Sequence, residues 1–191
     1  MTRVIAGTLR GRRLVTPEGM DTRPTMDKTK EALFGAIQFD VPGSRFLDLF
    51  AGSGGVGIEA LSRGADSLEL VECDSRALKA IRQNLRDLGL EDRSRVLPVK
   101  AERIVETYGC EGRQFDIIFM DPPYHQGWEE KVGNLIAESG ILSPGGMLII
   151  ESSSETDVRI ETLDLFKVKT YKTARFSFFR RKEAPPTLEN V

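Results

Sequence analysis

The chain has 191 residues, of which 40% are hydrophobic and 29% charged, which favours one globular domain with appendages over two full domains. Its formal net charge of −2 argues against a protein that coats nucleic acid indiscriminately. No apolar run approaches the roughly 18 to 20 residues of a membrane span, and the N-terminal sequence lacks the apolar block of a secretory signal, so we expect a cytoplasmic protein with no membrane partner. Cys73 and Cys110 have neither metal-site spacing nor a nearby histidine, and we expect reduced, structural cysteines and no metal site.

Residues 1–44 precede the predicted sheet and begin with an excess of positive charge. The stretch RVIAGTLRGRRLVTP predicts a basic β-hairpin that turns near Gly11. The stretch TMDKTKEALFGAI predicts a helix that packs Leu33, Phe34 and Ile37 on the core. Residues 1–30 hold seven basic and three acidic side chains, and residues 166–183 hold seven basic and one acidic. These runs are either solvated terminal surfaces or two basic flanks that bind a polyanion.

From residue 45 the chain alternates short apolar runs with amphipathic ones, the pattern of βα units around a parallel sheet. We expect strands over residues 45–50, 67–72, 94–99, 115–120 and 146–151. Helices are predicted in GVGIEALSRG and SRALKAIRQNLRDLGL, and each ends at a glycine. The tail LFKVKTYKTARFSFFRR predicts an antiparallel pair at the sheet edge. The prediction is an α/β domain over residues 45–183 with a mostly parallel sheet, followed by a flexible tail over residues 184–191.

The sequence LDLFAGSGGVGIEA follows the first of these strands and opens a helix. Gly52, Gly54 and Gly57 fit the G-x-G-x-x-G pattern of dinucleotide binding, and Glu72 lies 20 residues beyond Gly52, where a ribose-binding acid belongs. Taken alone, this fits an NAD dehydrogenase, but Asp48 would face a pyrophosphate with like charge. A ligand with an ammonium and a sulfonium is favoured instead, so we predict S-adenosylmethionine (SAM), held by Asp48, Gly52, Gly54 and Glu72. A tight turn that uses glycine only for packing is the alternative.

The strand FDIIFM ends on DPPY, which combines an acid, two prolines and an aromatic ring. Open α/β sheets place their chemistry at the carboxyl ends of strands, so Asp121 and Gly52 should line one crevice. The Asp121 carboxylate and the Pro122 carbonyl would accept the hydrogens of an exocyclic nucleobase amine and point its lone pair at the methyl group. Tyr124 would stack on an extruded base. An ordinary turn is the alternative reading of DPPY, and His125 is expected to be an exposed or capping residue rather than a general base.

Five stretches together resemble one known family: VIAGTLRGRRL, TRPTMDKTKEALF, LDLFAGSGGVGIEALSRGA, VECD and FDIIFMDPPY. They are similar to the bacterial 16S rRNA (guanine-N2)-methyltransferases of the small-subunit rRNA methyltransferase D family, over most of the chain. The glycine loop and DPPY are shared by many amine methylases, whereas the two N-terminal stretches are more specific. The resemblance implies a Rossmann-like SAM-dependent methyltransferase fold. It also implies methylation of the N2 amine of one guanine in 16S rRNA, within an assembled or assembling small subunit.

The resemblance also implies roles for individual residues. Asp121, Pro122 and Tyr124 become catalytic and base-binding residues, and the cofactor contacts are those predicted above. The segment around Arg23 and Thr25 would cover the active site. The hairpin would grip RNA phosphates through three arginines, namely Arg10, Arg12 and Arg13.

Two positions depart from the family pattern. Family members usually have an acid before an alanine after the third strand, where it approaches the adenine amine. Here VKAERI offers Lys100, which leaves the Ala101 backbone or Glu102 for the adenine contact. Near the C-terminus, YKTA stands where the family often has Tyr-Gly-x-Thr, which affects the edge strands rather than the chemistry.

Two other functions stay open at this point. A DNA adenine-N6 methyltransferase would also use DPPY, because an exocyclic amine beside this motif looks the same on either base. However, the 44 residues ahead of the sheet leave little room for a target-recognition domain. A nonenzymatic rRNA-binding assembly factor would explain the basic ends but not Asp48, Glu72 and Asp121. For the rRNA enzyme we expect a monomer.

Overall fold

The computed structural model of the chain describes residues 2–17, 25–123 and 126–182. Tyr124, Arg23 and His125 lie outside the described residues, as do the predicted tail and the side chain of Thr25. The predictions made for them therefore stay predictions.

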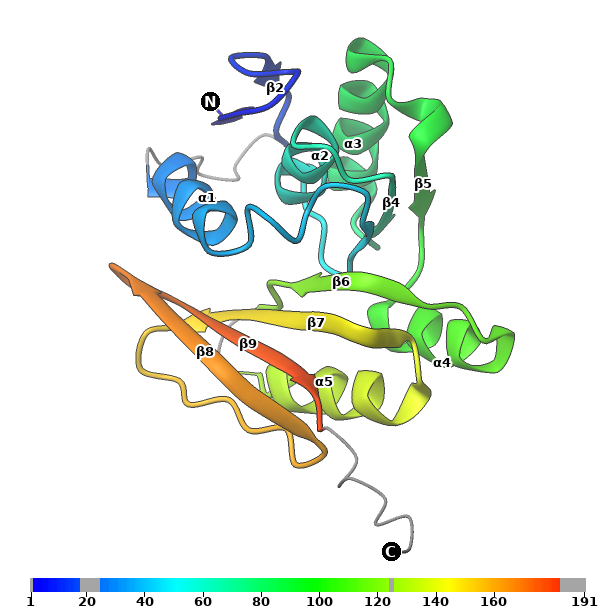
Figure 1. The fold of residues 1–191 in the computed structure, drawn as a ribbon. Coiled ribbons are helices and arrows are strands. Elements are labelled where there is room, and N and C mark those ends of the chain that lie inside the picture. Colours follow the sequence, from blue (N-terminus) through cyan, green and yellow to red (C-terminus); the bar gives the residue numbers. More distant parts are fainter. Residues whose placement is uncertain (1, 18–24, 124–125, 183–191) are drawn as a thin grey trace, which may run out of the picture.

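Seven strands form one sheet in the order β5-β4-β3-β6-β7-β9-β8 (Figure 1). The five parallel strands are β3 (Arg45–Asp48), β4 (Ser67–Val71), β5 (Ser94–Leu97), β6 (Phe115–Met120) and β7 (Leu142–Ser153). The last two strands, β8 (Leu163–Tyr171) and β9 (Ala174–Arg181), form the predicted antiparallel pair at the sheet edge. The predicted mostly parallel α/β sheet is therefore confirmed.

Helices cover both faces of the sheet (Figure 1). One face carries α1 (Thr25–Ala36), α2 (Gly55–Ser62) and α3 (Ser75–Leu88), and the other carries α4 (Ala101–Glu111) and α5 (Trp128–Ser139). A short 3-10 turn, η1 (Glu91–Arg93), leads into β5. Successive strand residues point to opposite faces, so neighbouring side chains enter different apolar clusters. Phe46 and Ile117 pack with the α1–α3 layer, whereas Leu47 and Ile118 pack with the α4–α5 layer.

The N-terminal segment, residues 2–17, forms a much shorter hairpin than its sequence predicts. Its strands β1 (Thr2–Arg3) and β2 (Arg13–Leu14) have two residues each. Gly11 lies in the turn with φ +84°, and its backbone N donates to the Val4 carbonyl oxygen at 2.9 Å, so the predicted turn position is confirmed.

The rest of the N-terminal segment hydrogen-bonds to α2 instead of across the hairpin. Glu59 is fully buried, and its carboxylate accepts hydrogen bonds from the backbone N atoms of Ile5 and Ala6, at 2.7 and 3.0 Å. The Ser62 hydroxyl donates to the Ala6 carbonyl oxygen at 2.6 Å and accepts from the Leu9 backbone N at 3.0 Å. These side chains satisfy backbone groups that a regular hairpin would pair with each other.

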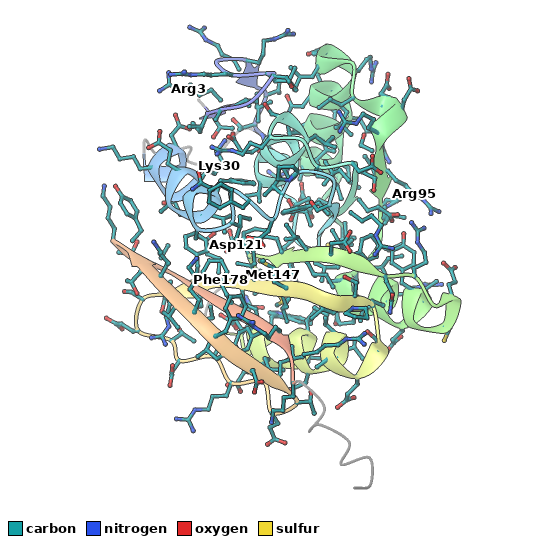
Figure 2. All side chains as sticks on the ribbon, in the orientation of Figure 1. Arg3, Lys30, Arg95, Asp121, Met147 and Phe178 are labelled. Atoms are coloured by element: carbon teal, nitrogen blue, oxygen red, sulfur yellow. The ribbon has the colours of Figure 1, made fainter. Side chains whose placement is uncertain are left out.

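Lys30 belongs to the basic N-terminal run but is buried between α1 and the N-terminal segment (Figure 2). Its Nζ donates to the Arg3 carbonyl oxygen at 2.6 Å and lies 3.7 Å from a carboxylate oxygen of Glu59. Burial lowers the pKa of Lys30, and the charge of Glu59 opposes this shift. Lys30 therefore cannot contact a polyanion, so fewer than the seven basic residues of this end are available for one.

The N-terminal segment and the sheet share one apolar core. Val4, Leu14 and Phe34 are buried in the same cluster as Phe46 and Ile58, so the packing is continuous across residue 44. The division at residue 44 is therefore not a packing boundary. That residues 1–44 bind RNA and residues 45–183 form the methyltransferase domain stays a prediction.

Cys73 and Cys110 are free, as predicted, but both are exposed. The prediction that they are structural is wrong, because neither contributes to the core. No helix in the described part of the chain is long and apolar enough to cross a membrane.

Candidate active site

The site lies where the strand order of the sheet reverses. The chain passes from β3 to β4 on one side, and β6 lies on the other side of β3. Asp48 ends β3 and pairs in register with Phe119 of β6, two residues before Asp121. Ligands bind at such switch points in open α/β sheets. The structure thus brings Asp48 and Asp121 to one edge of the sheet, with Asp121 near the centre of the molecule in Figure 2.

The glycine loop combines open backbone with close packing. Gly52 and Gly54 have left-handed φ angles of +55° and +82°. A Cβ atom at Gly52 would meet nothing within 4 Å, whereas one at Gly57 would lie 2.6 Å from the Leu68 side chain. Gly57 therefore lets α2 pack on β4, and Gly52 leaves bare backbone that a ligand can approach.

Asp48 is a buried carboxylate with an incomplete set of partners. The backbone N–H groups of Gly57 and Phe50 oppose the rise of its pKa, but Oδ1 has no hydrogen-bond partner among the described residues. Burial raises the pKa of Asp48 to about 7, and the nearby carboxylates of Asp121 and Glu72 add to the shift. A cationic group would stabilise the ionised form and pair with the free oxygen. The chemistry of this residue fits the ammonium of SAM.

Glu72 already holds the glycine loop. Its Oε2 accepts a hydrogen bond from the Gly52 backbone N at 2.8 Å, and its Oε1 accepts from Cys73 and Asp74 at 2.7 and 2.9 Å. A carboxylate has about four acceptor positions, so roughly one remains for a ribose hydroxyl. Glu72 therefore shapes the loop in addition to its predicted role.

Asp121 has two acidic neighbours that the sequence analysis missed. It is exposed at the open edge of the sheet, while Pro122 beside it is buried. The protein still removes much of the hydration of this carboxylate, which together with the charge of Glu129 raises the pKa of Asp121 to about 7. Met120, the last residue of β6, pairs with Ile150 of β7, so the next residues, Asp121 and Glu151, are neighbours.

Glu151 lies in β7, next to Asp121, which follows β6. Burial and the charge of Asp121 raise the pKa of Glu151 well above its ordinary value. An acid that ends an apolar strand was the available sequence signal, but the pairing of β6 with β7 was needed to place it. No group of three or more His, Cys, Asp or Glu in the described ranges could hold a metal ion.

The predicted adenine contacts lie at the start of α4. Ala101 is buried at the first position of this helix, and Lys100 precedes it without capping it through its side chain. The Glu102 carboxylate lies 3.3 Å from the Nζ of Lys131, which itself lies 4.4 Å from the centre of the Trp128 ring. Glu102 is thus already paired with Lys131. Of the two predicted adenine contacts, the Ala101 backbone is therefore the better candidate.

The three hairpin arginines are all exposed. Arg12 Nη2 also donates to the Asp87 carbonyl oxygen of α3 at 3.0 Å, so this side chain is partly committed to the fold. Arg10 lies in the turn and Arg13 begins β2, and both side chains are exposed.

Relatives of the chain are named as methyltransferases. The family described as conserved hypothetical protein 95 matches residues 2–180. The chain is 36% identical over 182 residues to the putative rRNA methyltransferase YlbH of Bacillus subtilis, which covers 94% of this chain and 99% of the relative. It is 35% identical over 153 residues to the ribosomal RNA small subunit methyltransferase D of Escherichia coli, which covers 80% of this chain and 75% of the relative.

Solved structures of methyltransferases share the fold of this chain. The putative methyltransferase YhhF of Escherichia coli aligns with a TM-score of 0.81 at 31% identity, covering 95% of this chain and 98% of that one. A SAM-dependent methyltransferase of Agrobacterium tumefaciens aligns with a TM-score of 0.62 at 18% identity, covering 84% and 63%, and shares the fold alone. The predicted Rossmann-like methyltransferase fold is confirmed. The chain belongs to the family described as conserved hypothetical protein 95 and is a relative of the ribosomal RNA small subunit methyltransferase D proteins.

Proposed function

We propose that this protein is a SAM-dependent methyltransferase that modifies the exocyclic N2 amine of a guanine in 16S rRNA, within an assembled or assembling small subunit. The name of the Escherichia coli relative supports the small-subunit rRNA substrate. The observation that carries the chemistry is the position of Asp121, beside Asp48 at the strand-order reversal and followed by the rigid Pro122. An rRNA substrate implies a cytoplasmic enzyme, and we keep the monomer as a prediction.

The cofactor would be held by Asp48, Gly52 and Gly54, with Glu72 toward the ribose and Ala101 or Glu102 toward the adenine. When bound, SAM supplies an electrophilic methyl group on a sulfonium. Asp48 offers an unpaired oxygen to the ammonium, and Gly52 offers open backbone. The neighbouring acids Asp48, Glu72 and Asp121 also favour a cation over the pyrophosphate of NAD.

Asp121 would act on the incoming amine. Its carboxylate and the Pro122 carbonyl accept the amine hydrogens, which orients the nitrogen lone pair toward the methyl group. After transfer the nitrogen is cationic and must lose a proton. A carboxylate with a pKa of about 7 is partly ionised near neutral pH and can accept it. Burial and the charge of Asp121 favour the neutral form of Glu151, so the negative charge that meets the cationic nitrogen would lie on Asp121.

The substrate would be held from outside the sheet. Arg10, Arg12 and Arg13 are exposed and would neutralise RNA phosphates, and Arg12 also donates a hydrogen bond to the Asp87 carbonyl oxygen. Tyr124 would stack on the extruded guanine, and the segment of Arg23 and Thr25 would cover it.

Substitution at Asp121 tests this function. In Asp121→Ala, SAM affinity should stay within about threefold while transfer of labelled methyl groups to unmethylated small subunits falls by about a hundredfold or more. Asp121→Asn keeps an acceptor oxygen but cannot take a proton, so partial activity is expected. Binding of NAD without SAM would overturn the cofactor assignment, and full activity of Asp121→Ala would remove this residue from the mechanism. Transfer to DNA adenine instead of RNA would favour the alternative enzyme.

A further inference from the structure

Asn84 of α3 links two segments that are far apart in the sequence. The residue is only 2% exposed. Its Oδ1 accepts a hydrogen bond from the Val15 backbone N at 2.7 Å, and its Nδ2 donates to the Val15 carbonyl oxygen at 2.9 Å. Nδ2 also donates to the carbonyl oxygen of Ser53 at 3.0 Å. Ser53 lies between Gly52 and Gly54 in the glycine loop, and Val15 directly follows β2 of the N-terminal segment.

These contacts use both hydrogens of the Asn84 amide. Because the side chain is buried, a displacement of either Val15 or Ser53 would leave a polar group unpaired away from water. The position of the N-terminal segment and the position of the glycine loop are therefore stabilised together. An asparagine on an amphipathic helix gives no sign of this in the sequence, since it is usually a solvated residue.

We propose that Asn84 is a positioning residue that couples rRNA binding to cofactor binding. The inference rests on the proposed function, because it requires both ligands. RNA held by the hairpin arginines restrains the N-terminal segment, and Asn84 passes that restraint to the Ser53 carbonyl. A glycine loop that is already restrained loses less conformational entropy when the cofactor binds. Linkage then requires the cofactor to strengthen RNA binding by the same factor.

Ser62 provides a matched control. It is 1% exposed and holds the N-terminal segment from α2 through Ala6 and Leu9, with no hydrogen bond to the glycine loop. Ser62→Ala therefore removes a buried anchor of the segment, like a substitution of Asn84, but leaves the link to Ser53 in place.

The coupling can be measured with S-adenosylhomocysteine, which does not react. Equilibrium dialysis of the labelled compound against the full chain, with and without unmethylated small subunits, gives the affinity ratio. Wild type and Ser62→Ala should bind it about fivefold or more tightly when small subunits are present. Asn84→Asp replaces the amide nitrogen, which donates both hydrogen bonds, by an acceptor oxygen. Val15→Pro removes the backbone N–H group that donates to Oδ1. In both variants the ratio should fall to about one.

Hydrogen exchange gives a second readout that mere destabilisation would not produce. Small subunits should slow exchange of the Ser53 and Gly54 amides in wild type but not in Asn84→Asp, after thermal melts have shown which variants are folded. A folded Asn84→Asp or Val15→Pro variant with the wild-type ratio would overturn the coupling, as would a ratio of one in wild type. Failure of wild type to bind small subunits at all would instead overturn the proposed function, and the coupling with it.

Discussion

Asp48 is the buried carboxylate proposed to meet the ammonium of the cofactor. Its pKa of about 7 lies above the ordinary value of 3.8, because burial penalises the charged form. The unfolded chain therefore loses this proton before the folded chain does as the pH rises. The stability that the protonated group contributes is complete below about pH 4 and is lost as the pH rises toward 7. A bound cation reverses this preference, since it favours the ionised carboxylate.

We expect SAM affinity to increase as the pH rises from about 5 to 7, and binding below pH 7 to release protons. Titration calorimetry in buffers of different ionisation enthalpy measures both quantities. Asp48→Asn should flatten the part of this dependence that belongs to Asp48 and lower the affinity about tenfold, the effect of losing one charge-assisted hydrogen bond. An affinity that is independent of pH in wild type, with no proton release, would mean that Asp48 does not meet the cation.

At the scale of elements, the turn between β8 and β9 contains a residue in an unfavourable conformation. Lys172 has φ +54° and is the only non-glycine residue with positive φ in the described ranges. Lys172 and Thr173 form the two-residue connection, and positive φ at the first position alone is the φ pattern of a type II′ turn, which favours glycine there. The sequence departs from Tyr-Gly-x-Thr at this position.

Lys172→Gly should therefore raise the free energy of unfolding by about 0.5 to 1 kcal/mol, because relief of the left-handed strain exceeds the added entropy of the unfolded chain. Urea unfolding of both proteins measures the difference. Thr173→Gly, a control one residue away without positive φ, should be destabilising. If Lys172→Gly were less stable than wild type, contacts of the lysine side chain would outweigh the strain.

The N-terminal hairpin is the element expected to hold RNA. Converting Arg10, Arg12 and Arg13 to Glu should weaken binding to small subunits and reduce the log-log salt slope by up to about 2 to 3, since each phosphate contact contributes about 0.7 to 0.9. A salt series on wild type and the triple variant measures this. Reversal of two exposed arginines far from the hairpin, Arg95 on β5 and Arg103 on α4, serves as the control. An unchanged slope in the triple variant would assign recognition to other surfaces.

The ends of a strand could be predicted where its apolar run was unbroken. They could not be predicted where proline or glycine interrupted the run. β6 agrees with its prediction at both ends, but β7 begins at Leu142 rather than residue 146. Pro144 and the two glycines after it hid that extension, because such residues are rare in strand interiors. The length of the hairpin strands was overestimated, because backbone groups of the N-terminal segment bond to Glu59 and Ser62, which lie on a helix far along the chain.

The candidate site follows the same rule. Asp48, Gly52 and Asp121 could be predicted because each stands in a local motif at the end of a strand. Glu151 and Asn84 could not, because their significance depends on which strand or segment lies next to them. The local sequence pattern predicts secondary-structure elements and motifs. Which residues distant in sequence become neighbours is known only from the folded structure.

At the scale of the whole molecule, the N-terminal segment and the sheet form one body. They share an apolar cluster, and buried polar side chains of α2 and α3 hold the segment in place. The groups proposed to contact RNA, the cofactor and the amine thus lie on one continuously packed unit. This arrangement is what a single reaction on a large substrate requires, since all contacts must be in register at once.

The central claim is methylation of guanine N2 in small-subunit rRNA. The most direct measurement is mass spectrometry of nucleosides from 16S rRNA of a strain that lacks this gene, compared with the wild-type strain and a strain complemented with Asp121→Ala. We predict that one N2-methylguanosine is lost in the deletion strain, returns with the wild-type gene and does not return with Asp121→Ala. An unchanged content of N2-methylguanosine in the deletion strain would contradict the claim.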